Sequence, residues 1–284
     1  MSKTRSATGP RAIVPIDLAL QGGGSHGAFT WGVLDRLLEV PWLRVDGISG
    51  TSAGAMNAVV LVDGHLKGGA EGTKEALSTF RRKVSDAALL SPFRRSLLDM
   101  LTGRGKVSGN AELSTQVLLA LACVPTLLQA VEIDGDPYWD GGYAGNPTIS
   151  PLVRECDAND IVLVQINPVQ RPGVPRSARE IHNRLNEVSF NSPLLKELRM
   201  IALLRQVTDP GHAEGALWAR MRMHRIATDA MLELGYSSKM IAEWPFLCHL
   251  RDEGRRAADA FLQAHGSDLG TRPSLDLDGL LEGV

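Results

Sequence analysis

The sequence predicts an α/β fold with a mainly parallel central sheet flanked by helices, and three observations support this prediction. First, a strand-like apolar run from Ile16 to Leu20 is followed by a glycine cluster and a helical pattern. Second, another short run over residues 43–48 leads into a second glycine-bounded turn and helix. Third, Ile161 to Ile166 is a continuous apolar run, which is typical of a strand buried on both faces. Strands that alternate with helices in this way form layered folds with parallel sheets.

The helices of the first third of the chain follow from apolar spacing. One is predicted by apolar residues at intervals of three and four that end before Pro41, namely Phe29, Val33, Leu34, Leu37 and Leu38. A helix of small residues is expected over residues 55–62, closed by Gly64. Residues 70–84 are also expected to be helical.

The remaining elements are predicted in the same manner. Spaced leucines and valines over residues 112–123 indicate a helix, and residues 131–140 indicate a hairpin whose turn is Asp134-Gly135. After a linker-like stretch the chain is expected to be mostly helical from residue 176 onward. The exception is residues 221–226, whose alternating pattern predicts a strand.

Composition excludes several classes of function. The 284 residues are 44% hydrophobic and 22% charged, as in an ordinary soluble globular protein. With a net charge of -2, the chain lacks the positive field that would collect nucleic acid. Three widely spaced cysteines predict neither a disulfide framework nor a metal site, so a reducing, cytoplasmic location is expected. Because no window reaches the ~18 apolar residues that span a bilayer, any membrane contact would be peripheral.

The turn after the second predicted strand contains a candidate nucleophile. Gly50-Thr51-Ser52-Ala53-Gly54 fits the pattern G-x-S-x-G, in which a serine sits on a tight strand-to-helix turn. Glycines two positions away are needed because side chains there would collide with the turn. The helix that follows directs its positive N-terminus at the site. Ser52 is therefore the candidate nucleophile.

The glycine cluster after the first predicted strand is a candidate oxyanion hole. Consecutive glycines between a strand and a helix leave backbone N–H groups free to face an anion. In a hydrolase that anion is the tetrahedral oxyanion of the reacting ester. The candidate residues are Gly22, Gly23, Gly24, Ser25 and Gly27.

Asp140 is the candidate general base. It stands at the end of a predicted strand and is followed by the flexible pair Gly141-Gly142, so it could reach a neighbouring loop. Serine hydrolases more often use a histidine. The histidines downstream of Ser52 lie in no special context and are interpreted as structural or solvated: His65, His182, His212, His224, His249 and His265.

These three blocks, in this order, resemble those of the patatin-like phospholipases. Stretches at residues 122–125, 138–142, 145–147 and 176–204 are similar to the bacterial branch of that family. The resemblance implies a three-layer fold and a Ser–Asp dyad that hydrolyses lipid or other ester bonds without metal or cofactor. Carried over by position, Ser52 would be the nucleophile and Asp140 the base. The backbone of residues 23–25 would hold the oxyanion.

The resemblance also implies a domain arrangement, with two departures from the family pattern. A mobile tail over residues 1–12 would precede a catalytic core over residues 13–175, with the helical region 176–284 packed on it. His26 stands where family members commonly have an arginine. Residues 65–110 look shortened, because they contain no apolar run that could supply the further strand of the family.

Two alternatives from other classes remain. Gly22-x-Gly24-x-x-Gly27 also fits the dinucleotide fingerprint, with Asp46 near the expected ribose-binding position. The shortened segment raises the other alternative, a degenerate scaffold or lipid-surface binder without catalysis. The basic run at residues 81–83 is interpreted as a solvated helix face, with anionic lipid headgroups as its functional alternative. Nothing in the sequence indicates an oligomeric state.

Overall fold

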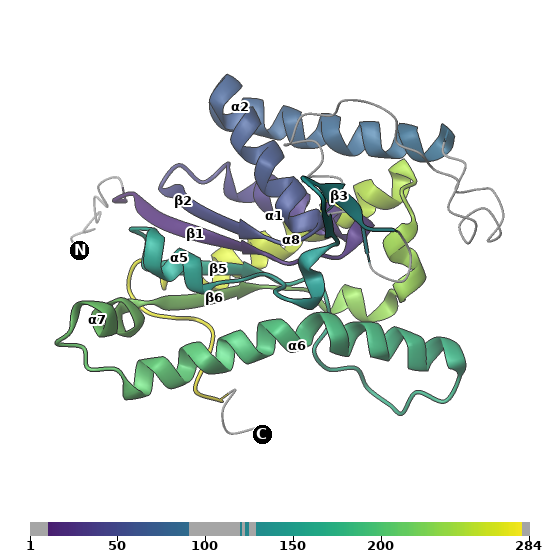
Figure 1. Cartoon of the computed structure of the whole chain (residues 1–284). Coiled ribbons are helices and arrows are strands. Elements are labelled where there is room, and N and C mark those ends of the chain that lie inside the picture. The colour runs from purple at the N-terminus through teal and green to yellow at the C-terminus, as the bar shows by residue number, and fades with distance from the viewer. Residues whose placement is uncertain (1–10, 91–119, 121–122, 125–128, 280–284) are drawn as a thin grey trace, which may run out of the picture.

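The centre of the molecule is a four-stranded parallel sheet (Figure 1). The computed structural model describes residues 11–90, 120, 123–124 and 129–279. The sheet has the strand order β2-β1-β5-β6, and its strands are β1 (Val14–Leu20), β2 (Leu43–Gly50), β5 (Asp160–Val164) and β6 (Arg222–Ile226). All four strands lie where the sequence predicts them, β6 from its alternating pattern and the others from their short runs.

Helices cover both faces of the sheet and make three layers (Figure 1). On one face lie α1 (Gly27–Leu37), α2 (Ala53–Leu90) and α8 (Trp244–His265). On the other lie α5 (Ser150–Glu155), α6 (Ala178–Val207) and α7 (Ala213–Arg220). The predicted three-layer α/β fold is confirmed.

The continuous apolar runs are explained by burial on both faces of the sheet. In β1, Ile16 and Leu18 enter the core with α1 and α8, whereas Ala19 enters the core with α5 and α6. β5 divides in the same way, with Val162 on the first side and Leu163 on the second. Such strands need apolar side chains at successive positions, since neither face is exposed to water.

The hairpin lies outside the main sheet and carries the candidate base. Its strands are β3 (Val131–Ile133) and β4 (Asp136–Tyr138). The φ angles of Asp134 and Gly135 are 52° and 90°, as a two-residue hairpin turn requires. The hairpin prediction is confirmed, but β4 ends at Tyr138, because Asp140 already caps the 3₁₀ helix η3 (Gly141–Tyr143).

The prediction that Gly64 closes a helix is wrong. α2 continues through it and bends only at Gly68 and Gly69, which have non-helical backbone angles. The two limbs of α2 then form a V (Figure 1). A methyl group on Gly64 would lie 2.6 Å from Thr73 Cα in the other limb. Gly64 therefore allows the two limbs to pack closely instead of ending the first one.

The segment predicted as shortened is only partly described. Residues 65–90 belong to α2 and contain no strand. The remainder, together with most of the helix predicted over residues 112–123, lies outside the described residues. Within the described part, β2 pairs with β1 alone and forms an edge of the sheet. The shortening itself stays a prediction.

The C-terminal region is helical, as predicted, and contributes one strand. α6 begins with a capping box in which Ser177 and Glu180 bond each other's backbone N–H groups. Two 3₁₀ helices, η4 (Asp229–Glu233) and η5 (Tyr236–Met240), lie between β6 and α8. Among the helices of the described residues, none is long and apolar enough to cross a membrane. The proposed division at residues 12 and 175 stays a prediction.

Candidate active site

Ser52 occupies a strained turn between β2 and α2. Its φ angle is 52°, in the left-handed region that residues other than glycine rarely adopt. A methyl group on Gly50 would lie 2.7 Å from Ala55 N, and one on Gly54 would collide with the Leu20 carbonyl oxygen. The turn can therefore form only with glycine at both positions, as the motif predicts.

Neighbours of Ser52 fix the turn in place. The Thr51 N–H donates to Leu20 O at 3.2 Å, and its hydroxyl donates to Gly145 O at 2.7 Å. Ala53 is buried and begins α2, so the positive end of that helix lies at Ser52. A negative charge that develops near Ser52 would be stabilised there.

The glycine loop passes directly beside Ser52. A methyl group on Gly22 would lie 2.9 Å from Ser52 Cβ. The loop continues through Gly23 into the 3₁₀ helix η1 (Gly24–His26), and Gly27 begins α1. The structure thus brings the predicted loop and the predicted nucleophile together.

The N–H groups of the loop differ in their partners. Gly22 N–H donates to Asn146 Oδ1 at 2.6 Å, and Gly27 N–H donates to the carbonyls of Gly24 and Ser25. These two N–H groups are engaged within the fold. Hydrogen bonds among the described residues do not use the N–H groups of Gly23 and Gly24, which leaves them able to bind an anion.

Three amide side chains hold the loop, and sequence reasoning did not single them out. Asn146 accepts from Gly22, and its Nδ2 donates to the Phe190 carbonyl at 3.2 Å. Asn167 Nδ2 donates to Gly22 O at 2.9 Å. Gln21 Oε1 accepts from the N–H groups of residues 166 and 167, at 2.7 Å each. Of the three, only Asn146 could have been found from the sequence, because it belongs to a stretch that is similar to the bacterial branch of the family.

Asp140 is buried beside Ser52, with 5% of its surface exposed. Its Oδ1 accepts from Gly142 N at 2.8 Å, and its own N–H donates to Cys123 O at 2.9 Å. Burial raises the pKa of Asp140, and hydrogen bonds from the Ser52 hydroxyl and the Gly142 N–H offset part of that rise. Gly141 begins η3, so the predicted base loop is formed.

The Ser52 hydroxyl lies close to the Asp140 carboxyl group, but no hydrogen bond of good geometry joins them among the described residues. The hydroxyl is close enough to lower the pKa of the carboxyl group. Asp140 Oδ2, however, is buried and has no partner of good hydrogen-bond geometry among the described residues. Catalytic hydrogen bonds are often long or poorly aligned before substrate binds.

The downstream histidines have other partners. His224 contacts Asp160 and Ser274, His265 contacts Asp268, and His212 lies 3.7 Å from Asp209. No hydrogen bond in the described part of the chain joins a histidine to Ser52 or Asp140. Within the same residues, no group of three or more histidine, cysteine or acidic side chains could hold a metal ion.

His26, at the position of the family's arginine, is uncharged. It is 4% exposed, and its Nε2 lies 2.8 Å from the Ser238 hydroxyl of η5. Burial, together with the nearby Lys239, lowers the pKa of His26 to about 3. The loop itself therefore carries no cation.

Asp46 is poorly placed to bind a ribose. It lies within β2, between the pairs Val45–Ile16 and Ile48–Leu18, and not at the end of the strand where the glycine loop runs. Its Oδ2 accepts from the N–H groups of residues 157 and 158, at 2.9 and 3.2 Å. This carboxylate stabilises a turn and does not face the loop, which disfavours the dinucleotide alternative.

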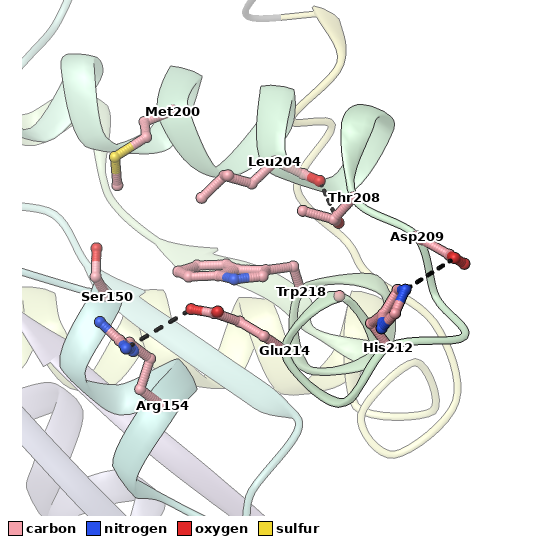
Figure 2. A pocket seen from close by; sticks show the side chains of 10 residues that line it. Ser150, Arg154, Met200, Leu204, Thr208, Asp209, His212, Glu214 and Trp218 are labelled. Carbon is pink, nitrogen blue, oxygen red and sulfur yellow. Dashed lines mark hydrogen bonds and ion pairs between the residues drawn. The ribbon is translucent and has the colours of Figure 1, made fainter.

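A surface pocket of about 530 Å³ lies elsewhere, among α5, α6 and α7. Figure 2 shows the Trp218 indole beneath α6, with Met200 and Leu204 above it and the Arg154–Glu214 ion pair below. No predicted site residue is part of its lining, which consists of Ser150, Arg154, Met200, Leu204, Thr208, Asp209, His212, Glu214, Gly215 and Trp218. The pocket therefore gives no support to a role in the candidate active site.

Comparison with known proteins bears on the N-terminal part of the chain. The family model described as patatin-like phospholipase matches residues 18–103. No curated protein is significantly similar to the chain. The match includes the glycine loop and the Ser52 turn and ends before Asp140, so it supports lipid acyl hydrolysis in general without assigning the base. Over residues 18–103 the chain is therefore similar to the patatin-like phospholipases, the family that its motifs resemble.

Proposed function

We propose that this protein is a serine lipid acyl hydrolase in which Ser52 is the nucleophile and Asp140 the general base. One observation carries the proposal: a serine in a strained left-handed turn lies beside a buried carboxyl group whose pKa is raised. The free N–H groups of Gly23 and Gly24 in the adjacent loop add to it. Strained and desolvated groups of this kind gather at functional sites.

The reaction would proceed through an acyl-enzyme. Ser52 Oγ attacks the ester carbonyl carbon while its proton passes to Asp140, and the carbonyl oxygen becomes an oxyanion. When the intermediate collapses, the alcohol leaves and takes the proton back from Asp140. Water then attacks the acyl carbon and gives a proton to Asp140. As the carboxylic acid leaves, this proton returns from Asp140 to Ser52 Oγ, which restores the enzyme.

The dyad is chemically sufficient because Asp140 is buried. A free aspartate, with a pKa near 3.9, is too weak a base to accept a serine proton readily. Burial raises the pKa of Asp140 and so strengthens it as a base. The Gly142 N–H holds one carboxylate oxygen, which fixes the direction of the other.

The oxyanion would be held by the backbone. The N–H groups of Gly23, Gly24 and Ser25 donate to no acceptor among the described residues and are the candidate donors, and the N-terminus of α2 adds its positive end. Gly22 contributes shape, since its own N–H is bound to Asn146. Removing a single oxyanion donor typically lowers the rate about 10²–10³-fold.

Active-site labelling tests the proposal directly. A fluorophosphonate should label the folded protein on Ser52, as identified by peptide mapping, and Ser52→Ala should lose both the label and the hydrolysis of phospholipid and of soluble esters. Ser49→Ala, at a neighbouring serine of β2 outside the turn, is the matched control and should still be labelled. A label on another serine would overturn the assignment. Well-folded protein with neither label nor hydrolysis would favour the alternative of a non-catalytic lipid-surface binder.

Lipid esters are the proposed substrate class, and a cytoplasmic location with peripheral membrane contact is the proposed setting. Vesicle sedimentation with and without anionic lipid would test the membrane contact. Neither a metal nor a cofactor is part of the proposed reaction, so turnover should persist in chelator. Loss of turnover on chelation would contradict this mechanism.

A further inference from the structure

Two partly or fully buried cations flank the glycine loop. Arg81 of α2 lies on one side, with only 3% of its surface exposed. Lys239 of η5 lies on the other, where its ammonium group is withdrawn from water. Neither forms an ion pair with a carboxylate in the described part of the chain. Because burying an unpaired charge is costly, such groups require an explanation.

Arg81 lies between the starts of α1 and α2. A methyl group on Gly27 would lie 2.9 Å from Arg81 Nη2 and 2.7 Å from Ala53 Cβ, so the guanidinium is next to both helix starts. Arg81 Nη2 donates to Asn57 Oδ1 at 2.7 Å, and Asn57 Nδ2 donates to Gly27 O at 2.9 Å. Its Nε has no partner among the described residues. Within the part of the chain that the structure describes, the acceptor of this cation is a neutral amide.

The interpretation of residues 81–83 as a solvated basic face is therefore wrong for Arg81. Arg82 and Lys83 are exposed, as expected of such a face, but Arg81 is turned inward. Burial lowers the pKa of Arg81 to about 10, which leaves it charged at neutral pH. Anionic headgroups outside the protein cannot reach it.

Lys239 supports the loop from the opposite side. Its Nζ donates to Asn167 Oδ1 at 2.6 Å and to Asn186 Oδ1 at 2.7 Å. Asn167 in turn donates to Gly22 O, so one amide links the ammonium group to the loop. The Lys239 carbonyl packs so closely on Gly24, which has a φ of 59°, that a methyl group there would lie 2.6 Å from it.

We propose that Arg81 and Lys239 are positioning residues for the proposed acyl transfer, which hold positive charge on both sides of the glycine loop and so strengthen oxyanion binding at Gly23 and Gly24. They act through the loop and do not touch the substrate. The tetrahedral oxyanion would supply the counter-charge that these cations do not find among the described residues. They supply the positive charge near the loop that the neutral His26 does not supply. The inference rests on the proposed function.

Paired substitutions test the inference. Turnover of a p-nitrophenyl ester is measured for Arg81→Met and Lys239→Met, which remove the charge and keep much of the volume. We expect kcat to fall about tenfold or more, with little change in KM, because the lost interaction is made mainly in the transition state. Arg81→Lys and Lys239→Arg should recover most of kcat. The exposed neighbours Arg82→Met and Lys196→Met are the matched controls, since both lie outside the site.

Two further measurements separate charge from structure. The thermal midpoint of the Met variants should change little, because removal of a buried charge offsets the lost hydrogen bond to Asn57 or Asn167. The second measurement is the decrease of kcat at alkaline pH. Burial lowers the pKa of Lys239 to about 8, so its charge is lost as the pH rises through that value. Lys239→Arg should move this fall to higher pH.

The titratable groups around Lys239 do not contribute a change of charge to the pH profile near pH 8. His26 of η1 is already neutral, and Glu187 of α6 is paired with Arg171 and Arg184. Burial raises the pKa of Tyr236 in η5 above its ordinary value of 10. Lys239 is therefore the group beside the loop that loses charge near pH 8.

Each outcome decides the inference. Met variants that fold and keep kcat within about twofold of the natural chain, or an alkaline limb unmoved by Lys239→Arg, would overturn it. If Arg81→Met does not fold, the kcat values of Arg81→Lys, Lys239→Met and Lys239→Arg test the inference instead. Fluorophosphonate labelling separates this inference from the proposed function. With Ser52 labelled and turnover insensitive to the two charges, only the inference fails. If the natural chain hydrolyses no ester, both fail.

Discussion

Asn146 Oδ1 accepts the Gly22 N–H at 2.6 Å, and this hydrogen bond joins the segment after Asp140 to the glycine loop beside Ser52. The segment that contains Asp140 thus comes from outside the main sheet and is tied to the two loops at the ends of β1 and β2. The Thr51 hydroxyl, which donates to Gly145 O, makes a second tie of the same kind. Together they determine the separation of Ser52 and Asp140.

Removing this tie should harm both stability and catalysis. Asn146→Ala leaves the buried Gly22 N–H and Phe190 carbonyl without their partner, which should lower the free energy of unfolding by about 1–3 kcal/mol. The displaced loop should lower kcat by up to about 10²-fold, as ~1 Å misplacements do. Urea unfolding and ester turnover measure the two effects. Gln206→Ala, at an exposed position of α6, is the control, and an Asn146→Ala protein with normal kcat would contradict the role of the tie.

Asp140→Asn should abolish turnover without weakening the fold at neutral pH. Burial raises the pKa of Asp140 above 3.8, so the charged form is disfavoured in the folded state and stability falls as pH rises through this pKa. An amide removes that cost. In the natural chain, kcat/KM should fall as the pH drops through the raised pKa, since the base becomes protonated. Retained turnover in Asp140→Asn would exclude Asp140 as the base.

Single replacement of each downstream histidine should leave turnover per folded molecule intact. The positions are His65, His182, His212, His224, His249 and His265. His224 should differ in stability alone, because it is fully buried and contacts both Asp160 and Ser274. Titration of active sites with the fluorophosphonate corrects each rate for unfolded protein. Loss of corrected turnover at any one position would indicate a conventional triad.

Asp17→Asn should stabilise the protein at neutral pH. Asp17 lies fully buried in β1, where its Oδ1 accepts from Gly47 N at 2.7 Å and its Oδ2 has no partner of good geometry within the described residues. Burial raises the pKa of Asp17 to about 6. The folded state therefore loses stability as the pH rises from about 4 to 6.

The gain from Asp17→Asn should reach about 1–3 kcal/mol at pH 7, since one pKa unit corresponds to about 1.4 kcal/mol. It should vanish below about pH 4, where the natural carboxyl group is protonated in both states. Denaturant unfolding at pH 4 and pH 7 measures the difference. Equal stability of the two proteins at both pH values would show that the carboxyl group is not strained by burial.

Local patterns predicted the elements well where near neighbours decide the conformation. The turn at Asp134-Gly135 and the serine turn between Gly50 and Gly54 formed as expected, since each depends on backbone angles and contacts within a few residues. The apolar runs predicted β1 and β5 because burial on both faces of a sheet requires them, and the alternating pattern of residues 221–226 predicted β6. Gly64 shows the limit of local patterns. Whether a glycine ends a helix or allows a second helix to pack closely against it depends on the tertiary structure around it.

By itself, the sequence determined the layered α/β fold, the similarity of residues 18–103 to patatin-like phospholipases, and the candidate roles of Ser52 and Asp140. Only the tertiary structure decided that Arg81 is buried, that Lys239 supports Gly24, and that Asn146 holds Gly22. The physical reason is that a motif records bonds between residues close in the chain. Burial of a charge and the partner of an amide depend on which distant elements meet, and no local pattern encodes that meeting.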